Sequence, residues 1–132
     1  MNILKGNINS LNTSGRLTIV TLDVSGFSLK SIIIENPETV TYLRIGNPIQ
    51  VMFKETEVVV GKGSDIAVSL DNRIDGVITE ITKGVLLSSL IIDTKAGKIK
   101  ATLTSESVTK LDLQPGEPVT ALVKTTEIML SE

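Results

Sequence analysis

The stretch that decides the fold runs Ala101-Thr-Leu-Thr-Ser-Glu-Ser-Val-Thr-Lys-Leu-Asp-Leu-Gln-Pro-Gly-Glu-Pro-Val-Thr-Ala-Leu-Val-Lys-Thr-Thr-Glu-Ile128. Thr104 suits the N-cap position of a short helix, because its hydroxyl can accept a hydrogen bond from a free backbone N–H. Val108 and Leu111 then fall on one face, and Gly116 follows as a helix stop. Val119–Val123 has the β-branched, apolar composition of a strand. The stretch therefore predicts a strand, a short helix and a second strand.

The same pattern occurs about 70 residues earlier in the chain. At this offset the matched positions are Gly6 with Gly76, Ile8 with Ile78, Asp23 with Asp93, Gly46 with Gly116, and Pro48 with Pro118. An offset of 68 places Pro37–Ile45 on Ser105–Leu113 and superimposes the cap candidates Asn36 and Thr104. The chain is thus a tandem duplication, with a first module over residues 1–61, a linker over 62–68 and a second module over 69–132. One module alone would bury little core, so contacts between modules or between chains are expected.

Composition favours strands in both copies. The chain has 16 Ile, 13 Val and 15 Thr, so one third of its 132 residues are β-branched. The predicted strands of the first copy are 17–22, 31–34, 48–53 and 57–60, and those of the second are 86–92, 98–103, 119–123 and 127–130. The predicted fold class is all-β, with two tandem OB-like barrel modules that each carry one short helix.

The residues that the chain lacks exclude several functions. With no Cys and no His, there is no thiolate nucleophile, no Ser-His-Asp triad and no zinc or haem site of the usual kind. The net charge of -2 and the 2% aromatic content argue against a nucleic-acid partner. No apolar run is long enough for a membrane span or a secretory signal, so we expect a cytoplasmic protein without a membrane partner.

Other motifs have simpler interpretations. Gly61-Lys-Gly-Ser64 lacks the spacing of a phosphate-binding loop, because Gly63 stands where that motif needs Ser or Thr. The carboxylates of Asp23, Asp93, Glu106 and Glu127 form no selected acid/base pair and are expected to be solvated. No constellation supports an enzyme. Thr104-Ser-Glu-Ser107 combines hydroxyls with free backbone N–H groups, an arrangement that can either cap a helix or hold a small anion.

The long stretch quoted above resembles the molbindin, or Mop/TOBE, family. It contains that family's T-x-E-S, L-x-L-x-x-G and V-x-A-L-V-K elements in order, and the duplication extends the resemblance to nearly the whole chain. The resemblance implies OB-like modules, self-association with a trimer favoured, and binding of molybdate or tungstate at interfaces between modules or subunits. Neutral N–H and O–H donors with one lysine can hold such a dianion without the residue types that the chain lacks.

Position by position, the resemblance assigns oxyanion contacts in the second module to Thr104, Ser107, Lys124, Thr125 and Ser69, with no residue binding a metal ion directly. Ser69 matches the serine of the family's S-A-R-N segment, and Asn72 stands in its Asn place. Two departures stand beside them. Asp71 replaces the family's arginine and puts a negative charge where a dianion would be contacted. Arg73 lies two residues further on and can compensate only if its side chain points the right way.

The first module departs further from the family pattern. Asn36, Thr39 and Lys54 occupy matching places as weaker candidates, Glu55 stands where Thr125 stands in the second copy, and Met1 falls in the arginine place. We therefore expect the second-module sites to be the functional ones. Two functions remain open: a non-enzymatic protein that binds, stores or buffers molybdate or tungstate, and a regulatory or protein-interaction module whose oxyanion sites are degraded.

Overall fold

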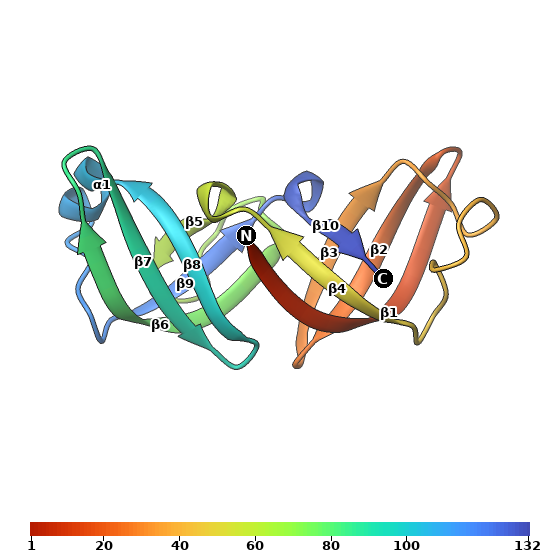
Figure 1. Cartoon of the computed structure of the whole chain (residues 1–132), viewed down its shortest axis with the longest axis horizontal. Helices are drawn as coiled ribbons and strands as arrows, with labels where there is room; N and C mark the ends of the chain where they lie inside the picture. The colour runs from red at the N-terminus through yellow and green to blue at the C-terminus, as the bar shows by residue number, and fades with distance from the viewer.

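The computed structural model describes all residues, 1–132, and consists of two five-stranded antiparallel sheets that curl into two barrel-like modules side by side (Figure 1). The first sheet contains β1 (Asn2–Ser14), β2 (Leu17–Val24), β3 (Phe27–Ile33), β4 (Pro48–Phe53) and β10 (Met129–Ser131). The second contains β6 (Asn72–Lys83), β7 (Leu87–Thr94), β8 (Gly97–Thr104), β9 (Pro118–Val123) and β5 (Val59–Lys62). The all-β prediction is confirmed.

The two sheets exchange their last strands. β5 follows β4 in sequence, yet it pairs with β9 of the second sheet, with Val59 opposite Leu122. β10 pairs in the same way with β4 of the first sheet, with Met129 opposite Met52. Residues 59–62 therefore belong structurally to the second sheet, and the C-terminal strand belongs to the first. The predicted module boundaries, after residues 61 and 68, mark the repeat in the sequence. They do not coincide with the division of the strands between the two sheets.

The first strand of each module is long and pairs with two neighbouring strands. Residues 2–7 of β1 pair with β4, and residues 7–14 pair with β2, with a register shift between Ile8 and Ser10. β6 repeats this arrangement with β9 and β7. The strand crosses its neighbour closely at Gly76, where an added Cβ would lie 2.6 Å from the Asp93 carbonyl oxygen. Glycine is therefore required at this crossing.

The prediction of one helix per copy is wrong for the first module. The second module has α1 (Ser105–Lys110) as predicted, whereas residues 36–43 of the first module form only turns. Two 3-10 turns, η1 (Glu55–Glu57) and η2 (Thr125–Glu127), connect the modules to their exchanged strands. The buried apolar side chains of both modules form a contiguous cluster of 24 residues. Packing between the modules thus compensates for the small size of each one.

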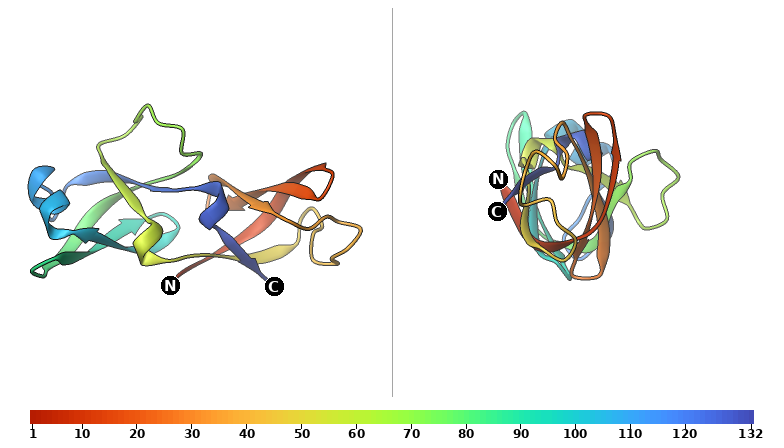
Figure 2. Two further views of the ribbon diagram at one scale, coloured as in Figure 1. Left: turned by 90° about the horizontal axis from the view of Figure 1, so that it is seen from above. Right: turned by 90° about the vertical axis from the view of Figure 1, so that its right-hand side faces the viewer.

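The segment between β5 and β6 forms a loop over residues 63–71 that projects from the molecule (Figure 2). Both ends of the chain lie on the opposite side (Figure 2). No helix in the structure is both long and apolar enough to cross a membrane.

Candidate oxyanion site

The hydroxyls of Thr104 and Ser107 are adjacent at the start of α1. Thr104 Oγ1 accepts a hydrogen bond from the Ser107 backbone N–H at 3.1 Å and donates one to Ser107 Oγ at 2.8 Å. Because Ser107 Oγ accepts in that bond, its own O–H remains available to a further acceptor. Thr104 is exposed and Ser107 half-buried. Thr104 therefore caps α1, and the Ser107 O–H remains as a hydrogen-bond donor at the surface.

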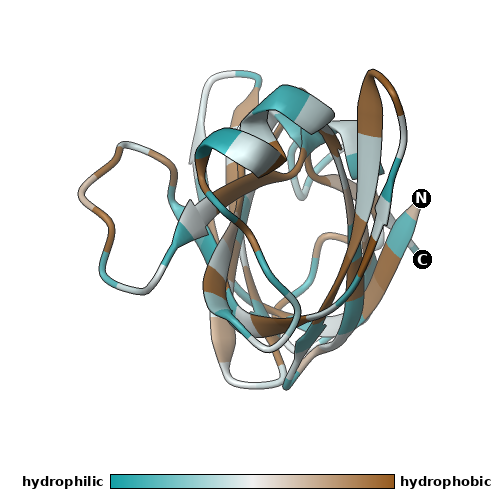
Figure 3. Cartoon of the chain, turned by 90° about the vertical axis from the view of Figure 1, so that its left-hand side faces the viewer, coloured by the Kyte–Doolittle hydropathy of each residue, from teal (hydrophilic) through white to brown (hydrophobic).

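A buried serine pair fixes this helix to the neighbouring hairpin. The Ser88 and Ser105 hydroxyl oxygens lie 2.8 Å apart, and Ser105 Oγ donates to the Gly84 carbonyl at 2.7 Å. The Ser105 N–H donates to the Leu86 carbonyl at 2.8 Å. The β6–β7 hairpin tip and the start of α1 thus form one rigid end of the second module, which Figure 3 shows from outside.

In the first module Asn36 and Thr39 use their side chains within their own turn. Asn36 Oδ1 accepts from the N–H groups of Glu38 at 2.9 Å and Thr39 at 3.2 Å. The Thr39 hydroxyl donates to the Asn36 carbonyl at 3.0 Å. The predicted cap at Asn36 is therefore present without a helix, and the Thr39 hydroxyl proton is already engaged.

Lys124 directly precedes η2, which begins at Thr125, and Lys54 and Glu55 occupy the same places at η1. The two turns share one backbone conformation: Lys124 has φ −65° and ψ 146°, and Lys54 has φ −73° and ψ 147°. Each turn contacts the other module, η2 against β3 and η1 against β8. Both lysines are exposed. The lysine candidates thus lie where the two modules meet, which we call the junction.

Two asparagines hold the junction together. Asn72 Nδ2 donates to the Lys30 carbonyl at 2.9 Å, and the Lys30 N–H donates to Asn72 Oδ1 at 2.6 Å. Asn2 makes the equivalent pair with Lys100, both bonds at 2.8 Å. Asn72, which the family pattern placed near the oxyanion contacts, is only 1% exposed and has this structural role.

The structure also brings Lys30 and Lys100 to the junction, two residues that were not predicted. Each lies on the strand that a 3-10 turn contacts, and each has an exposed side chain. The sequence could have indicated both lysines, because the offset of 70 that aligns Asn2 with Asn72 also aligns Lys30 with Lys100.

The loop over residues 63–71 contains Ser69 and Asp71, and Arg73 follows it in β6. Ser69 and Asp71 are exposed. The Arg73 guanidinium donates to the carbonyls of Ile66, of Val68 at 2.5 Å, and of Leu70 at 3.0 Å. Arg73 is therefore committed to holding the loop and does not take the place of the family's arginine at position 71.

The first-copy junction contains a firmly ionised carboxylate. Glu55 Oε1 accepts a hydrogen bond from the Met1 α-ammonium. This bond holds the pKa of the Glu55 carboxyl below its ordinary value, and the charge of Lys100 acts in the same direction. A negative charge therefore stands at position 55, where the second copy has the neutral Thr125.

One chain does not bring the second-module candidates together. Thr104 and Ser107 lie at the outer end of the second module with α1, whereas η2 with Lys124 and Thr125 lies at the junction (Figure 1). Ser69 lies in the projecting loop. A site that uses all three groups must therefore be completed by another copy of the chain.

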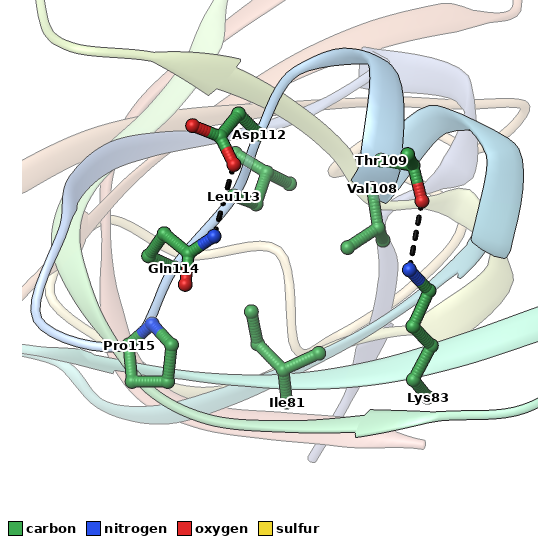
Figure 4. A pocket seen from close by; sticks show the side chains of 8 residues that line it. All are labelled: Ile81, Lys83, Val108, Thr109, Asp112, Leu113, Gln114 and Pro115. Carbon is green, nitrogen blue, oxygen red and sulfur yellow. Dashed lines mark hydrogen bonds between the residues drawn. The ribbon is translucent and has the colours of Figure 1, made fainter.

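One cavity of the second module lies beside the C-terminal end of α1. It has a volume of about 310 Å³ and contains Lys83, Thr109, Asp112 and Gln114 above Ile81, Val108 and Leu113, with Pro115 at its edge (Figure 4). Lys83 Nζ donates to Thr109 Oγ1 at 2.8 Å, and Gln114 Nε2 donates to Asp112 Oδ1 at 2.9 Å. None of the predicted oxyanion residues lines this cavity. No group of three or more Asp or Glu residues is placed to hold a metal ion.

The fold and the candidate residues define a two-module OB-like β protein with hydroxyl and ammonium donors at its outer end and its junction. The family model described as the TOBE domain matches residues 69–130, which cover the second module. The cytoplasmic molybdate-binding protein ModG, in a crystal form with molybdate bound, has the same fold, with a TM-score of 0.90 and 22% identity over 98% of this chain and 94% of that one.

Sequence relatives agree with the family model. Molybdenum-pterin-binding protein MopA of Rhodobacter capsulatus is 32% identical over 108 residues, which are 80% of this chain and 41% of that protein. Molybdenum-pterin-binding protein 2 of Clostridium pasteurianum is 29% identical over 66 residues, 49% of this chain and 97% of that protein. The chain thus spans about two fifths of the length of the Rhodobacter relative. The second module thus matches the TOBE domain, and the chain is similar in sequence to these molybdenum-pterin-binding proteins.

Proposed function

We propose that this protein is a non-enzymatic oxyanion-binding protein that stores or buffers molybdate or tungstate in the cytoplasm. The names of its relatives refer to molybdenum or molybdate binding. The observation that carries the proposal is the free Ser107 hydroxyl beside Thr104, oriented at the surface of a rigid end of the molecule. Such donors, joined by a lysine, suit a tetrahedral dianion.

The site is shared between chains. Thr104 and Ser107 of one copy meet Lys124 and Thr125 of another, with Ser69 as a further hydroxyl donor. A trimer is the assembly that we favour: contacts between two different surfaces form a ring when the rotation between neighbouring copies closes, and the resemblance to molbindins implies three copies. In the first module Asn36, Thr39 and Lys54 contribute less, since the Thr39 hydroxyl is engaged in its own turn and Glu55, unlike Thr125, has no hydroxyl to donate.

Titration calorimetry with molybdate, tungstate and sulfate tests the binding function. We expect heat with molybdate or tungstate well above that with sulfate. No heat above that of sulfate at micromolar protein would reject the proposal. The relative affinity of molybdate and tungstate then identifies the preferred ligand.

A mixing experiment tests whether sites are shared between chains. Ser107→Ala and Lys124→Ala chains, each impaired alone, are refolded together. A shared site recovers part of the binding, because Ser107 of the lysine variant meets Lys124 of the serine variant. Lys110→Ala, which removes an exposed lysine at the other end of α1, is the matched control and binds normally. No recovery in the mixture would mean that each site forms within one chain.

The second candidate function is a regulatory or protein-interaction module without oxyanion binding. The exposed Asp71 and the engagement of Arg73 in the loop favour it. Sedimentation with and without molybdate separates the two functions. A ligand bound between chains stabilises the assembly by mass action, whereas a pure interaction module is unaffected.

A further inference from the structure

Two charged side chains line the cavity beside the C-terminal end of α1, and neither has an ion-pair partner. Lys83 and Asp112 both border this cavity of about 310 Å³. The structure contains two ion pairs, and neither of them includes Lys83 or Asp112. The cavity therefore offers one positive and one negative group that the protein itself leaves unpaired.

The two charges lie on opposite sides of an apolar floor. Lys83 is on one side of the cavity, and Asp112 with Gln114 is on the other (Figure 4). The side chains of Ile81 and Val108 lie between the two sides (Figure 4). Val108 is only 4% exposed, so this part of the floor belongs to the core. A ligand that pairs with both charges must therefore cross an apolar surface between them.

The two sides differ in the hydrogen bonds that they still offer. Lys83 Nζ donates to Thr109 Oγ1 at 2.8 Å, and the Thr109 hydroxyl donates to the Ser105 carbonyl at 3.1 Å. An ammonium group has three N–H donors, so two of those on Lys83 remain. On the other side Asp112 Oδ1 accepts from Gln114 Nε2 at 2.9 Å, which leaves Asp112 Oδ2 and Gln114 Oε1 as acceptors. The first side thus suits an anionic group and the second an ammonium group.

The turn that carries Asp112 and Gln114 is held from outside the cavity. Lys62 Nζ donates to the Leu111 carbonyl at 2.7 Å and forms an ion pair with Glu117 at 3.0 Å. Glu117 Oε1 accepts a hydrogen bond from the Gln114 backbone N–H at 3.1 Å. The acceptor side of the cavity is therefore fixed before a ligand binds, which lowers the entropic cost of ordering it on binding.

The first module does not repeat this arrangement. At the offset of 70, Thr13 stands in the place of Lys83, and at the offset of 68, Arg44 stands in the place of Asp112. The floor changes as well, because Ile45 is 70% exposed where its second-module counterpart is 3% exposed. The opposed charges and their floor are thus particular to the second module, and the duplicated fold does not require them.

We propose that this cavity binds a small zwitterion whose carboxylate and ammonium groups are separated by a short apolar chain, as in an ω-amino acid. The carboxylate pairs with Lys83, the ammonium with Asp112 and the Gln114 side-chain oxygen, and the methylene groups lie over Val108. The volume is at the lower end of the range for small-molecule sites, roughly 300–1,000 Å³, and suits a ligand of this size. The inference is independent of the proposed oxyanion function, because the two sites share no residue.

Titration of the full chain with δ-aminovalerate, followed by NMR amide shifts, tests the site. We expect shifts that saturate at millimolar ligand and are concentrated at the residues that line the cavity. Valerate and pentylamine each carry only one of the two charged groups, so both bind more weakly than δ-aminovalerate. Shifts that do not saturate, shifts centred elsewhere, or equal binding of the three compounds would overturn the proposal.

Two variants assign the two ends of the ligand. Lys83→Met keeps the apolar stem and removes the ammonium group. Asp112→Asn keeps the shape, and asparagine tolerates the φ of +50° at this position. Each variant weakens δ-aminovalerate binding by roughly three- to tenfold, as expected for the loss of one charge-assisted hydrogen bond at an exposed group. Lys83→Met also weakens valerate but not pentylamine, and Asp112→Asn does the reverse.

Lys110→Met and Glu106→Gln are the matched controls. Both residues are exposed on α1 and neither lines this cavity, so neither variant changes the binding of the three compounds. If Lys83→Met shifts amide signals throughout the chain before ligand is added, Lys83→Gln replaces it. Wild-type affinity in the Lys83 and Asp112 variants, or an equal loss in the controls, would show that the opposed charges do not form the site.

Discussion

Asn72 and Lys30 join the two modules through both ends of one amide group. The Asn72 amide donates to the Lys30 carbonyl at 2.9 Å and accepts from the Lys30 N–H at 2.6 Å, so it continues the edge of β3 as a backbone strand would. Lys30 lies on β3, the strand that contacts η2. On the same strand the Ser31 hydroxyl donates to the carbonyl of Ile128, the residue after η2, at 2.8 Å. The position of the second-module lysine site therefore depends on the first module.

Substitution of Asn72 tests this coupling. Asn72→Ala removes the hydrogen-bond partners of the Lys30 N–H and carbonyl at a place where Asn72 itself is only 1% exposed. We expect a loss of ~1–3 kcal/mol in the free energy of unfolding for each group left unpaired. Urea denaturation measures the loss. Asn47→Ala is the control, since its amide bonds only to Tyr42 within the first module. Equal losses in the two variants would mean that the Asn72 bonds add nothing specific to the junction.

The two junction lysines are expected to contribute unequally. Lys124→Ala weakens molybdate binding by ~1.5–3 kcal/mol, the range for hydrogen bonds to a charged group, or roughly 10- to 150-fold in Kd. Lys54→Ala has a smaller effect, because the Thr39 hydroxyl of the first module is engaged in its own turn and Glu55, which is paired with the Met1 α-ammonium, offers no donor to an anion. Calorimetry on both variants checks the order. A larger loss for Lys54→Ala would reverse our ranking of the two modules.

The buried serine pair is expected to determine the stability of the outer end. Ser105→Ala removes the partner of the Ser88 hydroxyl and of the Gly84 carbonyl. We expect a loss of ~1–3 kcal/mol in the free energy of unfolding. Ser107→Ala, on the same helix and half-buried, changes stability far less but lowers oxyanion affinity. If the two variants showed the same pattern, the division between a structural and a ligand-binding serine would be wrong.

Tyr42 gives a clean pH prediction because it is the only Tyr in a chain without Trp. Burial, together with its hydrogen bond to Glu35 at 3.1 Å, raises the pKa of Tyr42 to about 12. The folded state thus favours the neutral phenol, so this contribution to stability is full below pH 10 and is lost as pH rises from 10 to 12. Phenolate absorbance should rise with a midpoint near 12, and Glu35→Gln should lower it. A midpoint near 10 in the folded protein would contradict the Glu35 contact.

The duplication and the aliphatic strands were predictable because they follow from residue types and their spacing. The first strands, β1 and β6, were not predicted, since β1 contains four Asn and two Ser that favour turns over strands. The exchange of β5 and β10 was also outside the reach of local patterns, because either sheet could accept an aliphatic strand. The first-module helix was wrong because Pro37 and the Asn36 amide stabilise a turn as readily as a helix start.

The candidate site shows the same limit. The resemblance supplied Thr104, Ser107 and Lys124 as types, and it did not show that they lie at opposite ends of one module. Arg73 had the correct charge for an anion contact, yet the carbonyls of Ile66, Val68 and Leu70 bind it. Asn72 has a side-chain amide that could donate to a ligand, yet both its oxygen and its nitrogen are hydrogen-bonded to the Lys30 backbone. Only three-dimensional contacts decide such competition for the same donors.

Asp71 is the residue whose removal should improve the site. It is exposed, it stands in the family's arginine place, and Arg73 is turned away into the loop. Asp71→Asn keeps the shape and removes the negative charge, so we expect molybdate binding to strengthen by about 1 kcal/mol, the upper value for exposed charge pairs. The gain should shrink at high salt, because exposed charges are screened. Asp93→Asn, an exposed carboxylate on β7, is the control. Calorimetry at two salt concentrations measures both effects, and an unchanged affinity at low salt would show that position 71 lies outside the oxyanion site of this protein.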